Sequence, residues 1–226
     1  MVSAKQQLDP RAAAVLKFWL GDQAVDGDNV SAAALAQWPA EREKLWWRGG
    51  PDLDAEIKAK FGRDLEAVAA GELDGWEDPT GTNPLNTLAG VILMDQFSRN
   101  VYRGTPGAFA LDPKALSWAQ RLAALEEARA WPHSFRIWIF MPFEHSESLE
   151  MQERCIALFE EEVARAEGGD GPPEAAGAAR SVLGYAHAHL AVIKAWGRFP
   201  HRNAILGRES TPEEIAGMAD GSIRKF

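Results

Sequence analysis

Residues 83–100 read NPLNTLAGVILMDQFSRN, and this stretch decides the fold. The opening Asn-Pro is a start signal for a helix, because proline fits well in the first helical turn. At about 100° per residue, the apolar side chains that follow occupy every side of the helix, which is typical of a helix buried on all faces. We therefore expect Asp95, Gln96 and Arg99 to point into the interior, with Arg103 continuing the same line.

Similar start and stop signals recur outward from this stretch. The expected further helices cover residues 10–20, 33–47 (split at Pro39), 52–70, 114–128 (after Asp112-Pro113), 148–166 and 180–196, with a last short helix behind a capping box at 211–214. No segment alternates with period two for long enough to predict a strand, and residues 135–143 stay ambiguous. We expect an all-α fold, one domain over 1–226 of antiparallel helical hairpins, with a flexible loop at about 167–177.

Composition and charge exclude several classes of protein. The 226 residues are 46% hydrophobic and 25% charged, as in ordinary globular domains. The 24 Lys and Arg against 33 Asp and Glu give a net charge of −9, so we expect no nucleic-acid partner. No apolar run approaches the roughly 20 residues of a membrane helix, and the first residues lack the apolar core of a signal peptide. We expect a soluble, cytoplasmic protein without a membrane partner.

The common catalytic and cofactor motifs are missing from the sequence. It contains no phosphate-binding P-loop, no dinucleotide-binding glycine motif, no serine-hydrolase elbow and no zinc-binding H-E-x-x-H. Its single cysteine, Cys155, excludes an internal disulfide and cysteine-rich zinc modules. His187 and His189 diverge by about 200° on a regular helix and cannot hold one ion together. We therefore predict no metal and no cofactor.

The first candidate cluster lies on the buried helix. Asp95 and Arg99 are four residues apart and can form an ion pair on one helix face. A buried charge is expensive unless it is paired, and perturbed charges in an interior favour a functional site only statistically. A structural pair and a functional one both stay open at this point.

The second candidate cluster is PFEHSE at 142–147. His145 and Glu147 lie just before an expected helix, where a histidine beside a carboxylate can serve acid–base chemistry. The alternative is that Ser146 or Ser148 caps the helix and Glu147 only complements its dipole.

The third candidate cluster is KAWGRFPHRNAILGR at 194–208, which carries four basic residues and no acidic one. Arginine's planar guanidinium suits bidentate binding of carboxylate or phosphate. The alternative is that these arginines cap helix ends and pair with the acidic run 160–162. His189, on the apolar arc of the preceding helix, is more often a hydrogen-bonded core histidine than a ligand.

Three motifs together resemble a known family: LMDQFSRNVYRGTPGAFALDPKAL (93–116), FMPFEHSESLEMQ (140–152) and WGRFPHRNAILGRESTPEE (196–214). In this order they closely resemble the bacterial family catalogued as domain of unknown function 924, which more often has phenylalanine at Trp196. The resemblance implies an all-helical fold similar to the tetratricopeptide-repeat superhelix. It implies no established activity, substrate or cofactor.

We expect the three clusters to converge on one polar pocket. The ligand-binding candidates are Arg99, Arg103, His189, Arg198, Arg202 and Asn203, and the catalytic candidates are Asp95, His145, Glu147 and His201. The first hypothesis is a protein that binds an anionic small molecule or an acidic peptide. The second is an enzyme that acts on a phosphorylated or carboxylated substrate by histidine–carboxylate acid–base chemistry. The third is a polar network that only stabilises the fold.

Geometry distinguishes these hypotheses. An enzyme needs a histidine and a carboxylate within hydrogen-bond reach in a concave site. A peptide-binding protein needs its arginines along an open groove. A purely structural network needs every charge paired and no cavity.

Overall fold

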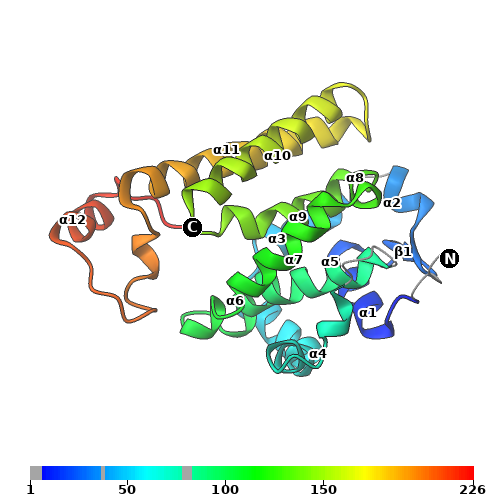
Figure 1. Ribbon diagram of the computed structural model, residues 1–226, viewed down its shortest axis with the longest axis horizontal. Helices are drawn as coiled ribbons and strands as arrows, with labels where there is room; N and C mark the ends of the chain where they lie inside the picture. Colours follow the sequence, from blue (N-terminus) through cyan, green and yellow to red (C-terminus); the bar gives the residue numbers. More distant parts are fainter. Residues whose placement is uncertain (1–6, 37–38, 78–82) are drawn as a thin grey trace.

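A computed structural model describes residues 7–36, 39–77 and 83–226, and these residues are mostly helical (Figure 1). The expected all-α fold is confirmed. The first six α-helices are α1 (Pro10–Leu20), α2 (Ala32–Ala36), α3 (Glu43–Trp47), α4 (Pro51–Ala69), α5 (Pro84–Ile92) and α6 (Ser98–Val101). They are followed by α7 (Asp112–Ala124), α8 (Glu126–Arg129), α9 (His133–Glu144), α10 (Leu149–Glu167), α11 (Pro173–Trp196) and α12 (Pro212–Asp220).

Short elements connect these helices. They are the 3₁₀ turns η1 (Ala40–Arg42), η2 (Asp74–Trp76), η4 (Pro106–Ala108) and η5 (Pro200–Arg202), and an antiparallel pair of two-residue strands, β1 (Val25–Asp26) and β2 (Asn29–Val30). Between α5 and α6 the chain makes a π-helical turn, η3 (Leu93–Phe97). Such turns insert an extra residue into a helix and recur at functional sites. Asp95 lies inside this one.

The helix boundaries follow from local side-chain chemistry. The Asp9 carboxylate accepts a hydrogen bond from the Arg11 N–H and caps α1. Thr211 and Glu214 form the expected capping box at α12, in which each side chain accepts from the other residue's N–H. Gly197 ends α11 at φ 69°, a left-handed conformation that glycine adopts at low cost.

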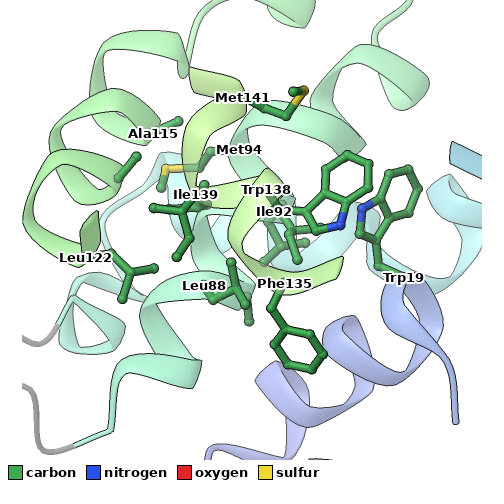
Figure 2. Packing of buried hydrophobic residues seen from close by; sticks show 14 of the residues in the cluster. Trp19, Leu88, Ile92, Met94, Ala115, Leu122, Phe135, Trp138, Ile139 and Met141 are labelled. Atoms are coloured by element: carbon green, nitrogen blue, oxygen red, sulfur yellow. The ribbon is translucent and has the colours of Figure 1, made fainter. Parts of the chain in front are cut away.

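The core is built around α5 and α9. Every residue of both helices is buried, as expected for 83–100. Figure 2 shows Leu88 and Ile92 from α5 packing with Trp138 of α9 and Trp19 of α1. The ambiguous stretch 135–143 is therefore helical, and it has no amphipathic pattern because both of its sides are covered.

The long helices α10 and α11 pack side by side against this core (Figure 1). The expected loop at 167–177 is shorter in the structure, because α11 begins at Pro173. Pro172 and Pro173 lie at the start of α11. Proline is well tolerated at the first position of a helix, so these prolines are compatible with a helix start as well as with a loop. The similarity to a tetratricopeptide-repeat superhelix stays a prediction. Within the described ranges no helix is long and apolar enough to cross a membrane.

Candidate functional site

The candidate site lies where η3, the end of α9, the start of α7 and η5 meet. At its centre the Asp95 carboxylate lies 2.8 and 3.0 Å from Nδ1 of His145. The same carboxylate accepts a hydrogen bond of 2.6 Å from the Gln96 side-chain amide. Asp95 is 1% exposed, whereas the His145 side chain is 15% exposed. The pair therefore joins a buried carboxylate to an imidazole at the edge of the interior.

Arg99 connects this pair to α7. Its guanidinium donates two hydrogen bonds of 3.1 Å to the two carboxylate oxygens of Asp112, a bidentate pair. It also donates to the backbone carbonyl of Asp95 and lies 3.4 Å from Asp95 Oδ1. Asp112 was expected to cap the following helix, but it lies in the first turn of α7 and uses its side chain for Arg99 instead.

Arg202 reaches the same place from η5. Its guanidinium lies over the rings of Phe109 and Phe199, 4.7 and 4.4 Å from their centroids. It donates a 3.0 Å hydrogen bond to the His145 carbonyl and lies 3.5 Å from Asp112 Oδ2. Its Nε is buried and makes no hydrogen bond to any described residue. Arg202 therefore keeps an unused donor inside the site.

The environment sets the protonation of Asp95 and His145. Burial alone would raise the pKa of Asp95, but the positive charges of His145 and Arg99 and its hydrogen bonds outweigh burial and lower the pKa to about 2. Burial and the Arg99 guanidinium lower the pKa of His145 below its ordinary 6.5, against the pull of Asp95. At neutral pH the structure thus favours an ionised carboxylate beside a neutral imidazole.

This protonation assigns the tautomer of His145. An ionised carboxylate only accepts hydrogen bonds, so Nδ1 carries the ring proton and Nε2 keeps a lone pair. Among the described residues none is within hydrogen-bond reach of Nε2, and this nitrogen is not a buried unpaired atom. The arrangement can therefore accept a proton at Nε2 while Asp95 stabilises the imidazolium that forms.

Burial shifts the pKa values of the two neighbouring charged groups, Arg202 and Asp112, in opposite directions. Burial and the nearby Arg99 lower the pKa of Arg202 to about 10, although Asp112 and Glu147 act against this shift. Burial raises the pKa of Asp112, and the Arg99 charge only partly offsets it. Both groups are charged at neutral pH, at the cost of desolvation.

A second histidine–carboxylate pair lies next to the first. Nδ1 of His189 is 3.0 Å from Glu144 and 2.9 Å from the Tyr185 carbonyl. The rings of His189 and His145 are 6.2 Å apart, and Phe226 stacks on the outer face of His189 at 3.5 Å. His189 is buried and hydrogen-bonded, as expected for a core histidine, yet it also adjoins the site.

His201 and Glu147 lie on the side of the site formed by η5. Burial and the Arg202 charge lower the pKa of His201 to about 4, and its Nδ1 is buried without a hydrogen bond to a described residue. Glu147 accepts from the Phe199 N–H and pairs with both terminal nitrogens of Arg208, which outweighs burial and lowers its pKa. The interpretation that Glu147 only complements a helix dipole is therefore wrong.

The other candidates form separate ion pairs. Arg103 binds the Asp54 carboxylate at 2.6 and 2.9 Å, away from the histidines. Arg198 binds Glu214 at 2.7 Å through two nitrogens, and Asn203 donates to the same carboxylate at 3.1 Å. The alternative pairing of these arginines with residues 160–162 is wrong.

In that acidic run Glu162 is occupied elsewhere. It lies buried between Arg136 and His133. The structure thus brings together Asp95, Arg99, His145 and Arg202, with His189, His201 and Glu147 around them.

Sequence reasoning missed three residues of this cluster. The sequence places Asp112 at a helix start, gives no role to Glu144, and shows Phe199 only as part of a basic segment. The signal available for Glu144 was its position directly before His145. For Asp112 no local signal existed, since Arg99 is 13 residues away; for Phe199 the contact with Glu147 spans 52 residues, although Arg202, which contacts its ring, is close in sequence.

A hollow of about 210 Å³ lies on the neighbouring side of Arg99. It is lined by Trp19, Leu45, Trp46, Trp47, Gly49, Gln96, Arg99, Asn100 and Arg103. None of the candidate histidines lines it; Gln96 and Arg99 link the hollow to the Asp95–His145 pair. Across the described residues no cluster of three histidine, cysteine or carboxylate side chains is arranged to hold a metal ion.

Comparison with known proteins agrees with this architecture. The solved structure of ATU0120, a protein of unknown function from Agrobacterium tumefaciens, is 28% identical, with a TM-score of 0.69 over 93% of this chain and 97% of that one. None of the curated proteins compared with the chain is a match. The family model described as bacterial protein of unknown function, DUF924, matches residues 15–222, which include all three motif clusters. The chain belongs to the DUF924 family.

Proposed function

We propose that the protein is an enzyme in which His145 acts as a general base on a small phosphorylated or carboxylated substrate. The observation that carries this proposal is the hydrogen bond from Nδ1 of His145 to the buried carboxylate of Asp95, which leaves Nε2 available. General-base catalysis by a side chain held in this way raises the reaction rate by about 100-fold or more.

The proton path follows from the assigned tautomer. His145 Nε2 accepts a proton from a substrate group or from a bound water molecule, and the ring becomes positively charged. Asp95, 2.8 Å from Nδ1, stabilises that charge without taking the proton. Once the bond in the substrate has rearranged, the imidazolium returns the proton to the product or the leaving group. Arg202, with its unused Nε, is the nearby donor for an anionic group of the substrate.

The first experiment measures turnover over panels of phosphate esters, carboxylic esters, amides and keto acids. The variants are His145→Gln, Asp95→Asn and, as a matched control, His187→Gln on the exposed side of α11. We expect a converted substrate whose turnover falls by about 100-fold or more in His145→Gln and is unchanged in His187→Gln. The wild-type rate should rise with pH through an apparent pKa below 6.5, because burial lowers the pKa of His145.

The tautomer provides a readout that needs no substrate. In ¹⁵N NMR of histidine-labelled protein at pH 7.5 we expect His145 to be neutral and protonated at Nδ1, and Asp95→Asn to remove this preference. A ring protonated at Nε2, or turnover that survives in folded His145→Gln, contradicts the proposal.

Binding of an anionic small molecule or an acidic peptide without turnover is the second candidate. It is favoured by the buried Nε of Arg202, because an unfilled donor on a charged group is costly unless a ligand uses it. A ligand at 100 times its dissociation constant stabilises the folded state by about 2.7 kcal/mol. Thermal stabilisation by such ligands, lost in Arg202→Lys and unaccompanied by conversion, would assign binding instead of catalysis.

A further inference from the structure

The hollow beside Arg99 has room for a small organic molecule. Its volume of about 210 Å³ corresponds to roughly seven water molecules at about 30 Å³ each. One wall is aromatic and comes from α1 and α3; the other is polar and comes from η3, α6 and Arg103. Most of the surface that the hollow exposes is polar, so the polar wall supplies the main contacts and the aromatic side chains border them.

The charges of the polar wall do not favour a simple anion. Arg99 is held by the two oxygens of Asp112, and Arg103 by the two oxygens of Asp54. Each guanidinium that lines the hollow therefore has its own carboxylate. A ligand with a negative charge alone would meet no excess positive charge here.

The hydrogen bonds within the polar wall determine which donors and acceptors remain for a ligand. The amide nitrogens of Gln96 and Asn100 donate to the carboxylates of Asp95 and Asp54. Since carboxylates only accept, both amides are oriented, and neither carbonyl oxygen accepts a hydrogen bond from a described residue. Arg103 is 61% exposed on its side chain and uses Nε and Nη2 for Asp54, which leaves Nη1 as a donor. The wall thus offers acceptors and one charged donor together.

The aromatic wall suits a positive charge or an aliphatic group. Trp47 is 51% exposed, which is unusual for tryptophan, and it stacks on Trp138 with ring centroids 5.7 Å apart. In the described part of the chain no lysine or arginine lies over the Trp47 ring. A tryptophan face attracts cations as well as apolar groups.

From this combination we propose that the hollow binds a small amino-acid-like zwitterion. Its ammonium group donates to the carbonyl oxygens of Gln96 and Asn100 and lies near the aromatic wall, and its carboxylate accepts from Arg103. The proposal does not depend on catalysis at His145, because the two places share Gln96 and Arg99 but no histidine. If His145 is also a base, the ligand of this hollow is either the carboxylated substrate of His145 or a second molecule that binds beside that substrate.

Calorimetric titration with matched probes tests the proposal. The zwitterions are glycine, β-alanine, both enantiomers of alanine and 4-aminobutanoate; propionate carries the negative charge alone, and propylamine the positive charge alone. We expect at least one zwitterion to bind about tenfold or more tightly than either single-charge probe. Propionate or propylamine binding as tightly as the best zwitterion overturns the proposal, and so does the absence of saturable binding of every zwitterion up to about 10 mM.

Variants locate the binding. Trp47→Ala and Arg103→Gln change exposed side chains, and glutamine at 103 still donates to Asp54, so both variants should fold. Each should weaken the zwitterion by about tenfold or more, whereas Arg48→Gln, which does not line the hollow, should change it by less than about twofold. His145→Gln should retain the binding, so a failed turnover test and a failed binding test remain distinguishable. Binding that is unchanged in both Trp47→Ala and Arg103→Gln overturns the assignment to the hollow.

Discussion

Three of the buried polar atoms that make no hydrogen bond within the described chain lie around the candidate site. Nε of Arg202, Nδ1 of His201 and Oε2 of Glu144 are buried and make no hydrogen bond within the described chain. Each such atom costs about 1–3 kcal/mol, and folded proteins rarely keep several of them close together. These three atoms beside His145 and His189 therefore lower the stability of this region, which agrees with the proposed site there.

His201 makes this cost measurable through pH. Its pKa is about 4 in the folded protein and near 6.5 when unfolded, so protonation favours the unfolded chain. Stability is complete above pH 6.5 and falls as the pH decreases from 6.5 towards 4, by about 2–3 kcal/mol from this residue. In urea unfolding at pH 7.5 and pH 4.5, His201→Gln should lose less stability than wild type.

The exposed His187 provides the control for this measurement. His187→Gln should lose as much stability on acidification as wild type does. Equal losses in wild type and His201→Gln would show that His201 is not held neutral by its surroundings.

At the scale of elements, the close approach of α5 and α7 fixes the position of the site. Gly90 faces the ring of Trp118, and a Cβ at position 90 would overlap that ring. Trp118 is a buried residue of α7, the same helix that presents Asp112 to Arg99. Glycine at 90 therefore serves packing, and it lets α5 carry η3 and Asp95 close to α7.

Gly90→Ala is expected to destabilise the protein by about 1–3 kcal/mol, because overpacking outweighs the gain in helix propensity. Gly184→Ala is the matched change in α11, where the added Cβ meets nothing within 4 Å. It should stabilise the protein by about 0.5–1 kcal/mol. Chemical denaturation of both variants checks the pair, and stabilisation by Gly90→Ala would contradict the packing argument.

At the scale of the whole molecule, the C-terminal segment is attached to the helical body largely by ion pairs. Figure 1 shows α12 lying apart from the main body, while the chain end returns close to the end of α9. The apolar cluster of this region is small, consisting of Val192, Ile193 and Phe199 with Trp196 beside it. Glu147 compensates for this by binding Arg208 and the Phe199 N–H across more than 50 residues of sequence.

Glu147→Gln should loosen this segment without unfolding the core. Glutamine keeps the size of the side chain but removes the charge, so we expect amide hydrogens in 198–211 to exchange about tenfold faster. Those of α5 should be unaffected. Glu153→Gln removes an exposed pair with Lys194 at 3.7 Å and is the control expected to have no effect. Faster exchange throughout both regions would mean that Glu147 supports the whole fold.

The positions of the helices along the chain were largely predictable because their signals are local. The Asn-Pro and Asp-Pro starts, the capping box at Thr211 and the terminal glycines act within a few residues, where backbone geometry and single hydrogen bonds decide. The limits of α11 were less predictable, since a run of glycine and proline is compatible with either a loop or a helix start. Burial of 83–100 followed from its lack of a polar face.

The candidate site was predictable only in part. The sequence by itself determined the all-α class, the burial of Asp95, the inward direction of Arg99 and the three segments that form the candidate site. Only the tertiary structure decided that His145 pairs with Asp95 and that Asp112 forms an ion pair with Arg99. It also decided that Arg103 and Arg198 bind other carboxylates. The physical reason is that helix signals depend on neighbours along the chain, whereas the partner of a buried charge is whichever opposite charge the packing of distant helices brings within about 3 Å.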